Sequence, residues 1–296
     1  MNIIQKFKIL TYNIGFLSCS LDELMTTGIK QNNIIWMKHN YKDRYFADPF
    51  LIKMDDKFLY VICEEYTFWE EKGKISLLKV DKKTFRLVEK KIIIEEQTHL
   101  SFPFCELNGD TITPESCKSG NCYKYTIDIK SWEILNKQII VKEGLIDAAF
   151  YTDIKGNEWI FASKDKIPST ELFLYYKKDG SYKEFENNPV LCNNRIARSA
   201  GKIFEWHGEL FRPVQDCKKR YGWQTKIMHI DELDINDYKA SEHITINSFE
   251  NPPYNETLHT LNVYDGCIVV DGSKDFLRFP MKFFYKKFRL FFKDRR

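Results

Sequence analysis

Hydrophobic and polar residues alternate with a period of two along most of this chain, which is the spacing of β-strands with one buried face. Five stretches share one pattern, in which two alternating apolar segments flank a short turn containing Asp, Asn or Gly. They cover residues 47–65, 101–116, 146–163, 198–216 and 259–272. Because Asp, Asn and Gly tolerate the positive φ of tight turns, each stretch predicts an antiparallel hairpin.

Further alternating segments fill the intervals between these hairpins, at residues 74–81, 121–128, 170–178 and 225–231. The units recur at a spacing of roughly fifty residues, the length of one four-stranded propeller blade. The sequence therefore predicts an all-β fold, a five-bladed β-propeller over residues 1–275. A two-sheet sandwich is the alternative, but it gives no reason for the same hairpin to recur five times.

The first hairpin begins with an Asp-Pro pair, Asp48 and Pro49, inside the segment RYFADPFLI. Both residue types are depleted in strands, and Pro is tolerated chiefly at the first residue of a strand. We therefore expect Pro49 to open a strand, with Asp48 at its mouth. Asp48 then either caps a turn through nearby backbone N–H groups or lines a central site.

In a propeller the inner strand of each blade borders the central channel, so equivalent positions of the repeats converge there. The residues at the heads of the five repeats are Asp48, Ser101, Asp147, Arg198 and His259. The far ends of the hairpins add Glu64 or Glu65, Glu115, Gln215 and Asp216. Such a set suits sugar chemistry, in which a carboxylic acid protonates a leaving oxygen and a carboxylate acts as base or nucleophile.

We predict three catalytic carboxyl groups: Asp48, Asp147 and Glu115. The predicted substrate-binding residues are Glu65, Arg198, Arg212, Gln215, Asp216 and His259. Of the adjacent Glu64 and Glu65, only one points inward on a strand, and we expect it to be Glu65. Arg212 suits bidentate capture of a phosphate or carboxylate. The structural alternatives are a solvated loop carboxylate for Glu115, an Arg–Asp pair between blades for Arg212, and a hydrogen-bonded core histidine for His259.

Sequence motifs for metal or nucleotide chemistry are missing. The eight cysteines include no CxxC pair, and the chain contains no HExxH, P-loop or GxGxxG. We therefore expect reduced thiols, no metal and no cofactor. The N-terminal segment lacks the apolar core and small-residue cleavage site of a signal peptide, and no window reaches the ~18 apolar residues of a membrane span. These features favour a cytoplasmic protein.

Charge is distributed unevenly along the chain. The formal net charge is +3, yet residues 276–296 carry eight Lys or Arg and one acid. The mildly acidic remainder argues against nucleic-acid binding. At about one hundred degrees per residue, the basic side chains of residues 276–296 form a narrow stripe and the phenylalanines fill the rest. We therefore expect an amphipathic helix here that binds an anionic membrane surface at the inner face of the membrane; a helix packed on the propeller or a partner is the alternative.

The motifs FADPFLI, HLSFPF with TPES, IDAAF, RSAGKIF, LFRPVQDCKKRYG and LHTLN follow one another in this order, preceded by YNIGFL. Together they resemble the N-terminal domain of the plant glucosamine inositolphosphorylceramide transferase family and its stand-alone bacterial and viral relatives. The resemblance covers nearly the whole chain. It implies a five-bladed propeller similar to those of the arabinanase, levansucrase and invertase superfamily, in agreement with the repeat.

In those hydrolases, an Asp heads the first blade as base or nucleophile, a second Asp heads the second blade, and a Glu in the third blade is the general acid. The resemblance puts Asp48 at the first position and Asp147, one carbon shorter than Glu, at the third. Ser101 and Phe102 offer no acid at the second position, which disfavours an ordinary glycosidase. In the plant family, transferase activity is expected from a separate C-terminal domain, for which this chain leaves no room.

The resulting hypothesis is a carbohydrate-active protein in glycolipid or surface polysaccharide biosynthesis, acting on a sugar, nucleotide sugar or glycolipid. The first form of it is a glycosyltransferase-type enzyme that uses the three carboxyl groups for acid/base work, with Arg198 and Arg212 holding an anionic group. The alternative is a non-catalytic, glycan-binding or glycolipid-binding propeller that serves a separate glycosyltransferase. A glycoside hydrolase is the third form.

Overall fold

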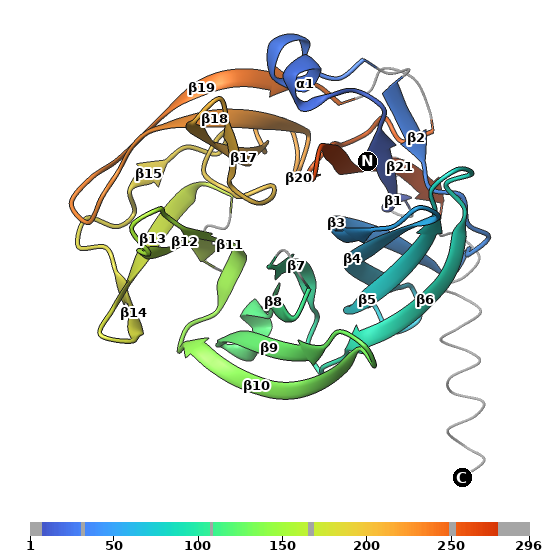
Figure 1. The fold of residues 1–296 in the computed structure, drawn as a ribbon, viewed down its shortest axis with the longest axis horizontal. Coiled ribbons are helices and arrows are strands. Elements are labelled where there is room, and N and C mark those ends of the chain that lie inside the picture. The colour runs from blue at the N-terminus through green and yellow to red at the C-terminus, as the bar shows by residue number, and fades with distance from the viewer. Residues whose placement is uncertain (1–7, 31–32, 107–108, 165–168, 249–252, 278–296) are drawn as a thin grey trace.

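The computed structural model describes residues 8–30, 33–106, 109–164, 169–248 and 253–277. Five antiparallel sheets surround a common centre (Figure 1), so the predicted five-bladed, all-β propeller is confirmed. A short helix, α1 (Leu21–Thr27), begins at Ser20, whose hydroxyl accepts the Glu23 N–H as N-cap residues do. A 3₁₀ turn spans Cys117–Ser119.

The first four blades are built from strands in chain order. Blade I contains β3 (Arg44–Met54), β4 (Phe58–Thr67), β5 (Lys72–Asp81) and β6 (Leu87–Ile94). Blade II contains β7 (Ser101–Cys105), β8 (Thr111–Glu115), β9 (Cys122–Asp128) and β10 (Glu133–Val141). Blade III contains β11 (Leu145–Thr152), β12 (Glu158–Lys164), β13 (Glu171–Lys178) and β14 (Ser181–Glu184), with β15 (Leu191–Cys192) also paired to β13. Blade IV contains β16 (Phe204–Trp206), β17 (Glu209–Asp216), β18 (Gln224–Leu233) and β19 (Tyr238–Ile246).

Blade V closes the ring by joining the two ends of the described chain. It contains β20 (Leu261–Tyr264), β21 (Cys267–Leu277), β1 (Lys8–Leu17) and β2 (Ile34–Trp36). Strand β1 pairs with β21 from Lys8–Leu277 to Leu17–Ile268, a closure that the hydrophobic pattern did not predict. Strand β21 extends through the first two residues of segment 276–296; the helix predicted for that segment lies outside the described residues from 278 onward.

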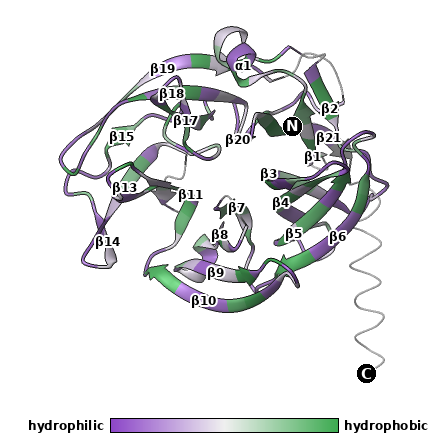
Figure 2. Cartoon of the chain, viewed as in Figure 1, coloured by the Kyte–Doolittle hydropathy of each residue, from purple (hydrophilic) through white to green (hydrophobic). Residues whose placement is uncertain are grey.

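Each of the five predicted hairpins forms one pair of neighbouring strands at the start of a blade: β3–β4, β7–β8, β11–β12, β16–β17 and β20–β21. The four intervening segments predicted as strands correspond to β5, β9, β13 and β18. Figure 2 shows hydrophobic and hydrophilic residues interleaved along these strands. The period-two pattern thus located these strands correctly.

Strand β3 does not begin at Pro49, contrary to the expectation from sequence. It starts at Arg44 and runs through a β-bulge, where the pairing register shifts between Ala47 and Phe50 and Asp48 has a φ of 51°. Pro49 is accommodated because its missing N–H falls where the ladder is already interrupted. The bulge turns the Asp48 side chain out of the regular alternation.

Equivalent bulges interrupt β7 and β11. Phe102 has a φ of 37° beside a register shift in β7, and Asp147 has a φ of 45° beside a shift in β11. The blade II residue equivalent to Asp48 is therefore Phe102, and the assignment of Ser101 to that position was wrong by one residue. Positive φ is uncommon for residues other than Gly, and it marks three positions where the fold imposes strain.

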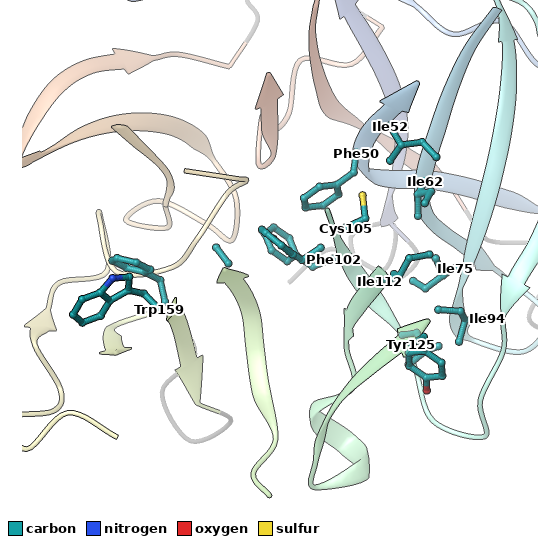
Figure 3. Close-up of a cluster of buried hydrophobic side chains, with 14 of the residues drawn as sticks. Phe50, Ile52, Ile62, Ile75, Ile94, Phe102, Cys105, Ile112, Tyr125 and Trp159 are labelled. Carbon is teal, nitrogen blue, oxygen red and sulfur yellow. The ribbon is translucent and has the colours of Figure 1, made fainter. Parts of the chain in front are cut away.

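Apolar side chains from neighbouring blades fill the space between the sheets. Figure 3 shows Phe50 and Phe102 close together, and their rings meet edge to face at a centroid distance of 5.3 Å. The same buried cluster extends to Trp159 in blade III. This packing fixes the inner strands relative to one another and thereby fixes the polar groups that those strands carry.

Candidate active site

Asp48 joins three blades through its hydrogen bonds. Its Oδ2 accepts the Phe102 N–H at 2.9 Å from blade II, and its Oδ1 lies 3.3 Å from Nε2 of His259. Its own N–H donates to Oδ2 of Asp271, on β21, at 2.9 Å. The side chain is buried and contacts other blades rather than its own turn, so Asp48 is not a local turn cap.

His259 lies between two carboxyl groups. Its Nδ1 is 2.7 Å from Oδ1 of Asp271, which also accepts the Thr260 N–H at 3.0 Å. Burial lowers the pKa of His259, but the charge and hydrogen bond of Asp271, together with the charge of Asp48, outweigh burial and raise this pKa to about 9. Burial raises the pKa of Asp48 to about 7, against the opposing charge of His259. An imidazolium therefore stands beside a carboxyl group that titrates near neutral pH.

Asp147 occupies the equivalent bulge in blade III and binds a different set of groups. Its Oδ2 accepts Nε of Arg198 at 2.5 Å and Nε2 of Gln215 at 2.9 Å. The Arg198 guanidinium also lies 3.9 Å from Oε2 of Glu115 and stacks over the Tyr221 ring at 4.7 Å. One carboxylate oxygen of Asp147 thus accepts hydrogen bonds from two side chains of blade IV and the segment that leads into it.

Glu115 and Glu64 complete the cluster. Burial raises the pKa of Glu115 well above its usual range, and the neighbouring charge of Asp147, to which it also hydrogen-bonds, adds to the shift. Burial likewise raises the pKa of Glu64, and the charge of Asp48 raises it further. One oxygen of Glu64 is buried without a hydrogen-bond partner among the described residues. Burial therefore favours the protonated form of both glutamates.

The centre thus brings together six of the nine predicted site residues, namely Asp48, Glu115, Asp147, Arg198, Gln215 and His259. The Tyr221 ring lies 5.4 Å from the His259 ring while it covers Arg198, which links the group around Asp48 to the group around Asp147. These side chains come from all five blades or from the segments that lead into them. The convergence expected from the repeat is observed.

The other three predicted residues make contacts elsewhere. Glu65 faces away from Glu64 and binds Arg44, Lys90 and Ser76. Arg212 is fully buried and donates to backbone carbonyls of Ile196 and Ala197. Asp216 is paired with Arg195 at 3.1 Å. The inward-pointing glutamate is therefore Glu64. Arg212 holds neighbouring backbone carbonyls and, among the described residues, forms no Arg–Asp pair, which was the structural alternative.

Three groups of the centre escaped prediction: Glu64, Tyr221 and Asp271. Asp271 interrupts the apolar run CIVVDG in the last repeat, and an acid in a buried strand is a signal that sequence reasoning could have used. Tyr221 belongs to the quoted motif LFRPVQDCKKRYG, but nothing in its spacing directs it to Arg198.

Asp48, His259 and Asp271 are the one described group with suitable atoms for a metal ion, since one ligand atom from each lies within 4.8 Å of the others. Both imidazole nitrogens already face carboxylate oxygens, at 2.7 and 3.3 Å. This is hydrogen-bonding geometry, and a cation at Nε2 would have to displace the Asp48 contact. The arrangement fits an imidazolium between two acids better than a metal centre.

Fold and site together define the class of protein: a five-bladed β-propeller with a buried cluster of carboxyl groups, an arginine and a histidine at its centre. A family model, described as glucosamine inositolphosphorylceramide transferase 1, N-terminal, matches residues 33–256. The chain belongs to this family, which confirms the resemblance seen in its motifs.

Curated relatives carry the same name. The glucosamine inositolphosphorylceramide transferase 1 of Arabidopsis thaliana is 29% identical over 210 residues, which is 67% of this chain and 27% of that protein. The Oryza sativa subsp. japonica protein is 27% identical over 209 residues, 67% of this chain and 28% of the relative. The match thus spans little more than a quarter of either relative.

Solved structures share the fold. A GH43_1 enzyme from Xanthomonas citri, complexed with xylotriose, has a TM-score of 0.53 at 9% identity, with 79% of this chain and 88% of that chain covered. CoXyl43, a GH43 β-xylosidase/α-arabinofuranosidase from a compost metagenome, has a TM-score of 0.52 at 11% identity, with 81% and 93% covered. At such identities the similarity concerns the propeller alone.

Proposed function

We propose that this chain is a carbohydrate-active protein that transfers a glycosyl group at the centre of its propeller. The observation that carries the proposal is the contrast between Asp48 and Glu115. Burial raises the pKa of Asp48 to about 7 but leaves it beside the His259 cation, whereas burial raises the pKa of Glu115 well above its usual range and so favours its protonated form. Two carboxyl groups with separated proton affinities are the requirement for acid/base chemistry on a sugar.

The roles of the residues follow from these environments. An acceptor hydroxyl attacks the anomeric carbon while its proton passes to Asp48. The bond from that carbon to the leaving oxygen breaks, and Glu115 donates a proton to this oxygen. Arg198 holds Asp147 at 2.5 Å and stands close enough to Glu115 to stabilise the carboxylate that Glu115 becomes. His259 orients Asp48 through the contact at Nε2.

The substrate class is proposed from the relatives. Their name describes transfer of glucosamine to inositolphosphorylceramide, so we propose a nucleotide sugar as donor and a glycolipid or polysaccharide precursor as acceptor. Since the match covers little more than a quarter of those proteins, the activity of the whole relative is not assigned to this chain by similarity alone. It is the carboxyl cluster that supports catalysis within the propeller.

A second candidate function is glycan binding without catalysis, in the service of a separate glycosyltransferase. One observation favours it. The bulge position of blade II, equivalent to Asp48 and Asp147, carries Phe102, whose ring is buried against Phe50. The centre therefore lacks a carboxyl group at one of its three equivalent bulges.

Turnover by Asp48 variants separates the two candidates. The purified full chain is incubated with UDP-N-acetylglucosamine and vesicles of inositolphosphorylceramide, and in parallel with xylotriose, while UDP release and new reducing ends are measured. Asp48→Asn keeps the shape and, because Asn tolerates positive φ, the bulge; it should lower turnover at least a hundredfold. Asp56→Asn, an exposed acid in the adjoining turn, is the matched control. Glycan binding without any turnover by the wild type would favour the second candidate.

We also propose that residues 278–296 attach the protein to an anionic membrane surface at the cytoplasmic face. Their basic and aromatic composition supports attraction to anionic lipid together with insertion of apolar rings. Among the described residues, no helix has the length and apolar character to cross a membrane. The full chain should bind anionic vesicles, and high salt should weaken this binding. Removal of residues 278–296 should abolish the binding and leave the thermal unfolding of the propeller unchanged.

A further inference from the structure

A pocket lies where blades V and I meet and is lined in part by residues of β1 and β3. Figure 1 shows these two strands next to each other. Its volume is about 340 Å³, enough for a diphosphate or a phosphorylated ring. The segment that joins β2 to β3 forms one wall, and its backbone is tied to the β5–β6 turn because Lys38 N–H donates to Phe85 O at 2.8 Å and Lys38 O accepts Leu87 N–H at 3.0 Å. We name this space the basic pocket.

Positive charge dominates the lining of the basic pocket. Its charged side chains are Lys38, Lys42, Arg44, Arg86 and Lys274, and none of its lining residues is acidic. Arg44 is neutralised by Asp43 and Glu65, each at 2.5 Å. The other four cations form no ion pair with any residue that the structure describes. Four uncompensated cations around one cavity create a local potential that attracts anions.

Neighbouring side chains respond to this positive potential and add hydrogen-bonding groups to the pocket. Burial, together with the charges of Lys42 and Lys274, lowers the pKa of His39. Nδ1 of His39 is buried without a hydrogen-bond partner among the described residues. Aromatic side chains of Tyr12, Tyr41, Phe68 and Tyr254 complete the walls. A neutral imidazole and tyrosine hydroxyls supply hydrogen bonds, and the aromatic faces suit a sugar or base next to a phosphate.

The basic pocket adjoins the central site across one side chain. Tyr12, a pocket residue, has its ring 4.8 Å from the ring of His259 and 5.3 Å from that of Tyr45. On the other side of Tyr12, five carboxyl groups face two cations among the described residues: Asp48, Glu64, Glu115, Asp147 and Asp271 against Arg198 and His259. The pocket therefore attracts a phosphate more strongly than the acidic centre does, whereas an uncharged sugar suits the centre.

We infer that the basic pocket binds the phosphate-bearing part of a ligand, a phosphate ester or diphosphate. Because Tyr12 and His259 put the pocket on the Asp48 side of the centre, its position suits the phosphate of the acceptor whose hydroxyl reaches Asp48, and this link, unlike anion binding itself, rests on the proposed function. Glu65, predicted to contact substrate, acts here indirectly: with Asp43 it holds the guanidinium of Arg44 in the pocket wall. All three guanidinium nitrogens of Arg44 donate to these carboxylates, so Arg44 supports the wall of the pocket.

Anion binding by the full chain tests the inference. Isothermal titration uses three probes: inorganic pyrophosphate, UDP, and phosphatidylcholine vesicles with phosphatidylinositol phosphate. The test variant combines Lys38→Gln with Arg86→Gln, because both side chains are exposed and unpaired among the described residues. The control combines Lys155→Gln with Lys178→Gln, two exposed lysines of blade III, which removes the same charge far from the pocket.

We expect the test variant to bind pyrophosphate and UDP at least about tenfold more weakly than the wild type, and the control to bind as the wild type does. If vesicle binding alone responds to the test variant, the phosphate belongs to a lipid headgroup. Binding of every probe with unchanged affinity, or of none by the wild type, would overturn the inference. This experiment measures no turnover, so its result stands even if the proposed function fails. Conversely, turnover that depends on Asp48, without anion binding in the pocket, would refute the pocket proposal alone.

Discussion

At the scale of single residues, Arg198 is the cation on which the acidic centre depends. It contacts Asp147 at 2.5 Å and Glu115 at 3.9 Å and is itself buried. A buried charge that loses its partner costs several kcal/mol, more than the pair contributed. Arg198 therefore stabilises the fold as well as the site.

Arg198→Met keeps the length of the side chain and removes its charge. We expect the free energy of unfolding at pH 7.5 to fall by about 3 kcal/mol, because Asp147 is left as a buried carboxylate without its cation. Chemical denaturation at pH 7.5 measures this loss. Arg220→Met, which breaks the exposed pair with Glu256, should cost less than about 1 kcal/mol; equal losses in the two variants would contradict the assignment.

His259 should give stability a distinct dependence on pH. Its pKa is raised from 6.5 to about 9 in the folded state, so between these values the native protein binds more protons than the unfolded chain. Stability is therefore fully present below pH 6.5 and declines as pH rises toward 9, by roughly 1–3 kcal/mol. Denaturant titrations from pH 6 to 9.5 should show a shallower decline in His259→Gln. The exposed His207→Gln variant should follow the wild type, and a parallel slope in His259→Gln would remove His259 as the source.

Sequence reasoning at the residue scale succeeded where the repeat fixed a position and failed where local geometry decided. Asp48, Asp147, Arg198 and His259 were found because each heads a hairpin. The bulge residue of blade II was misplaced by one, although both Asp48 and Phe102 precede a proline. Glu65 was preferred to Glu64 because the alternation of side chains along a strand does not indicate which set faces the centre. The bulge in β3, which pairs with the strand that carries both glutamates, decides this.

At the scale of elements, the loop between β17 and β18 positions His259 from outside. Gly222 in this loop has a φ of 57°, and a Cβ at that position would lie 2.3 Å from Cβ of His259. Gly208 also has positive φ, 81°, but a Cβ there would meet nothing within 4 Å. A comparison of the two positions therefore separates the effect of positive φ from that of the close approach to His259.

Gly222→Ala should destabilise the protein by more than Gly208→Ala, whose cost is about 1 kcal/mol from positive φ alone. It should also displace His259 and lower turnover or ligand binding, while Gly208→Ala leaves function intact. Thermal unfolding and the ¹⁵N chemical shifts of the His259 ring measure both effects. Identical behaviour of the two variants would show that the loop does not position the histidine.

Most elements could be predicted because each hairpin carries its own turn and alternation. Strand β1 could not be assigned to a blade, since its partner β21 lies at the other end of the chain and its alternation does not indicate which strand it joins. Helix α1 is only seven residues long, too short for a helical period to stand out. Such elements are decided by tertiary contacts.

At the scale of the whole molecule, the ring separates two chemical environments by a single tyrosine. Acidic groups from four of the five blades occupy the centre, and uncompensated cations surround the basic pocket at the junction of blades V and I. Neither environment is visible in the overall charge of +3, since the opposing groups cancel in a sum. The fold gives the charges their effect by placing them apart.

A crystal structure of the Glu115→Gln variant soaked with UDP-N-acetylglucosamine tests the central claim most directly. The claim is that the carboxyl cluster at the propeller centre handles a sugar. We predict a sugar ring within hydrogen-bonding distance, about 3 Å, of Asp48 and residue 115. Density for the sugar on an outer blade surface, with the centre unchanged from the unsoaked crystal, would contradict it.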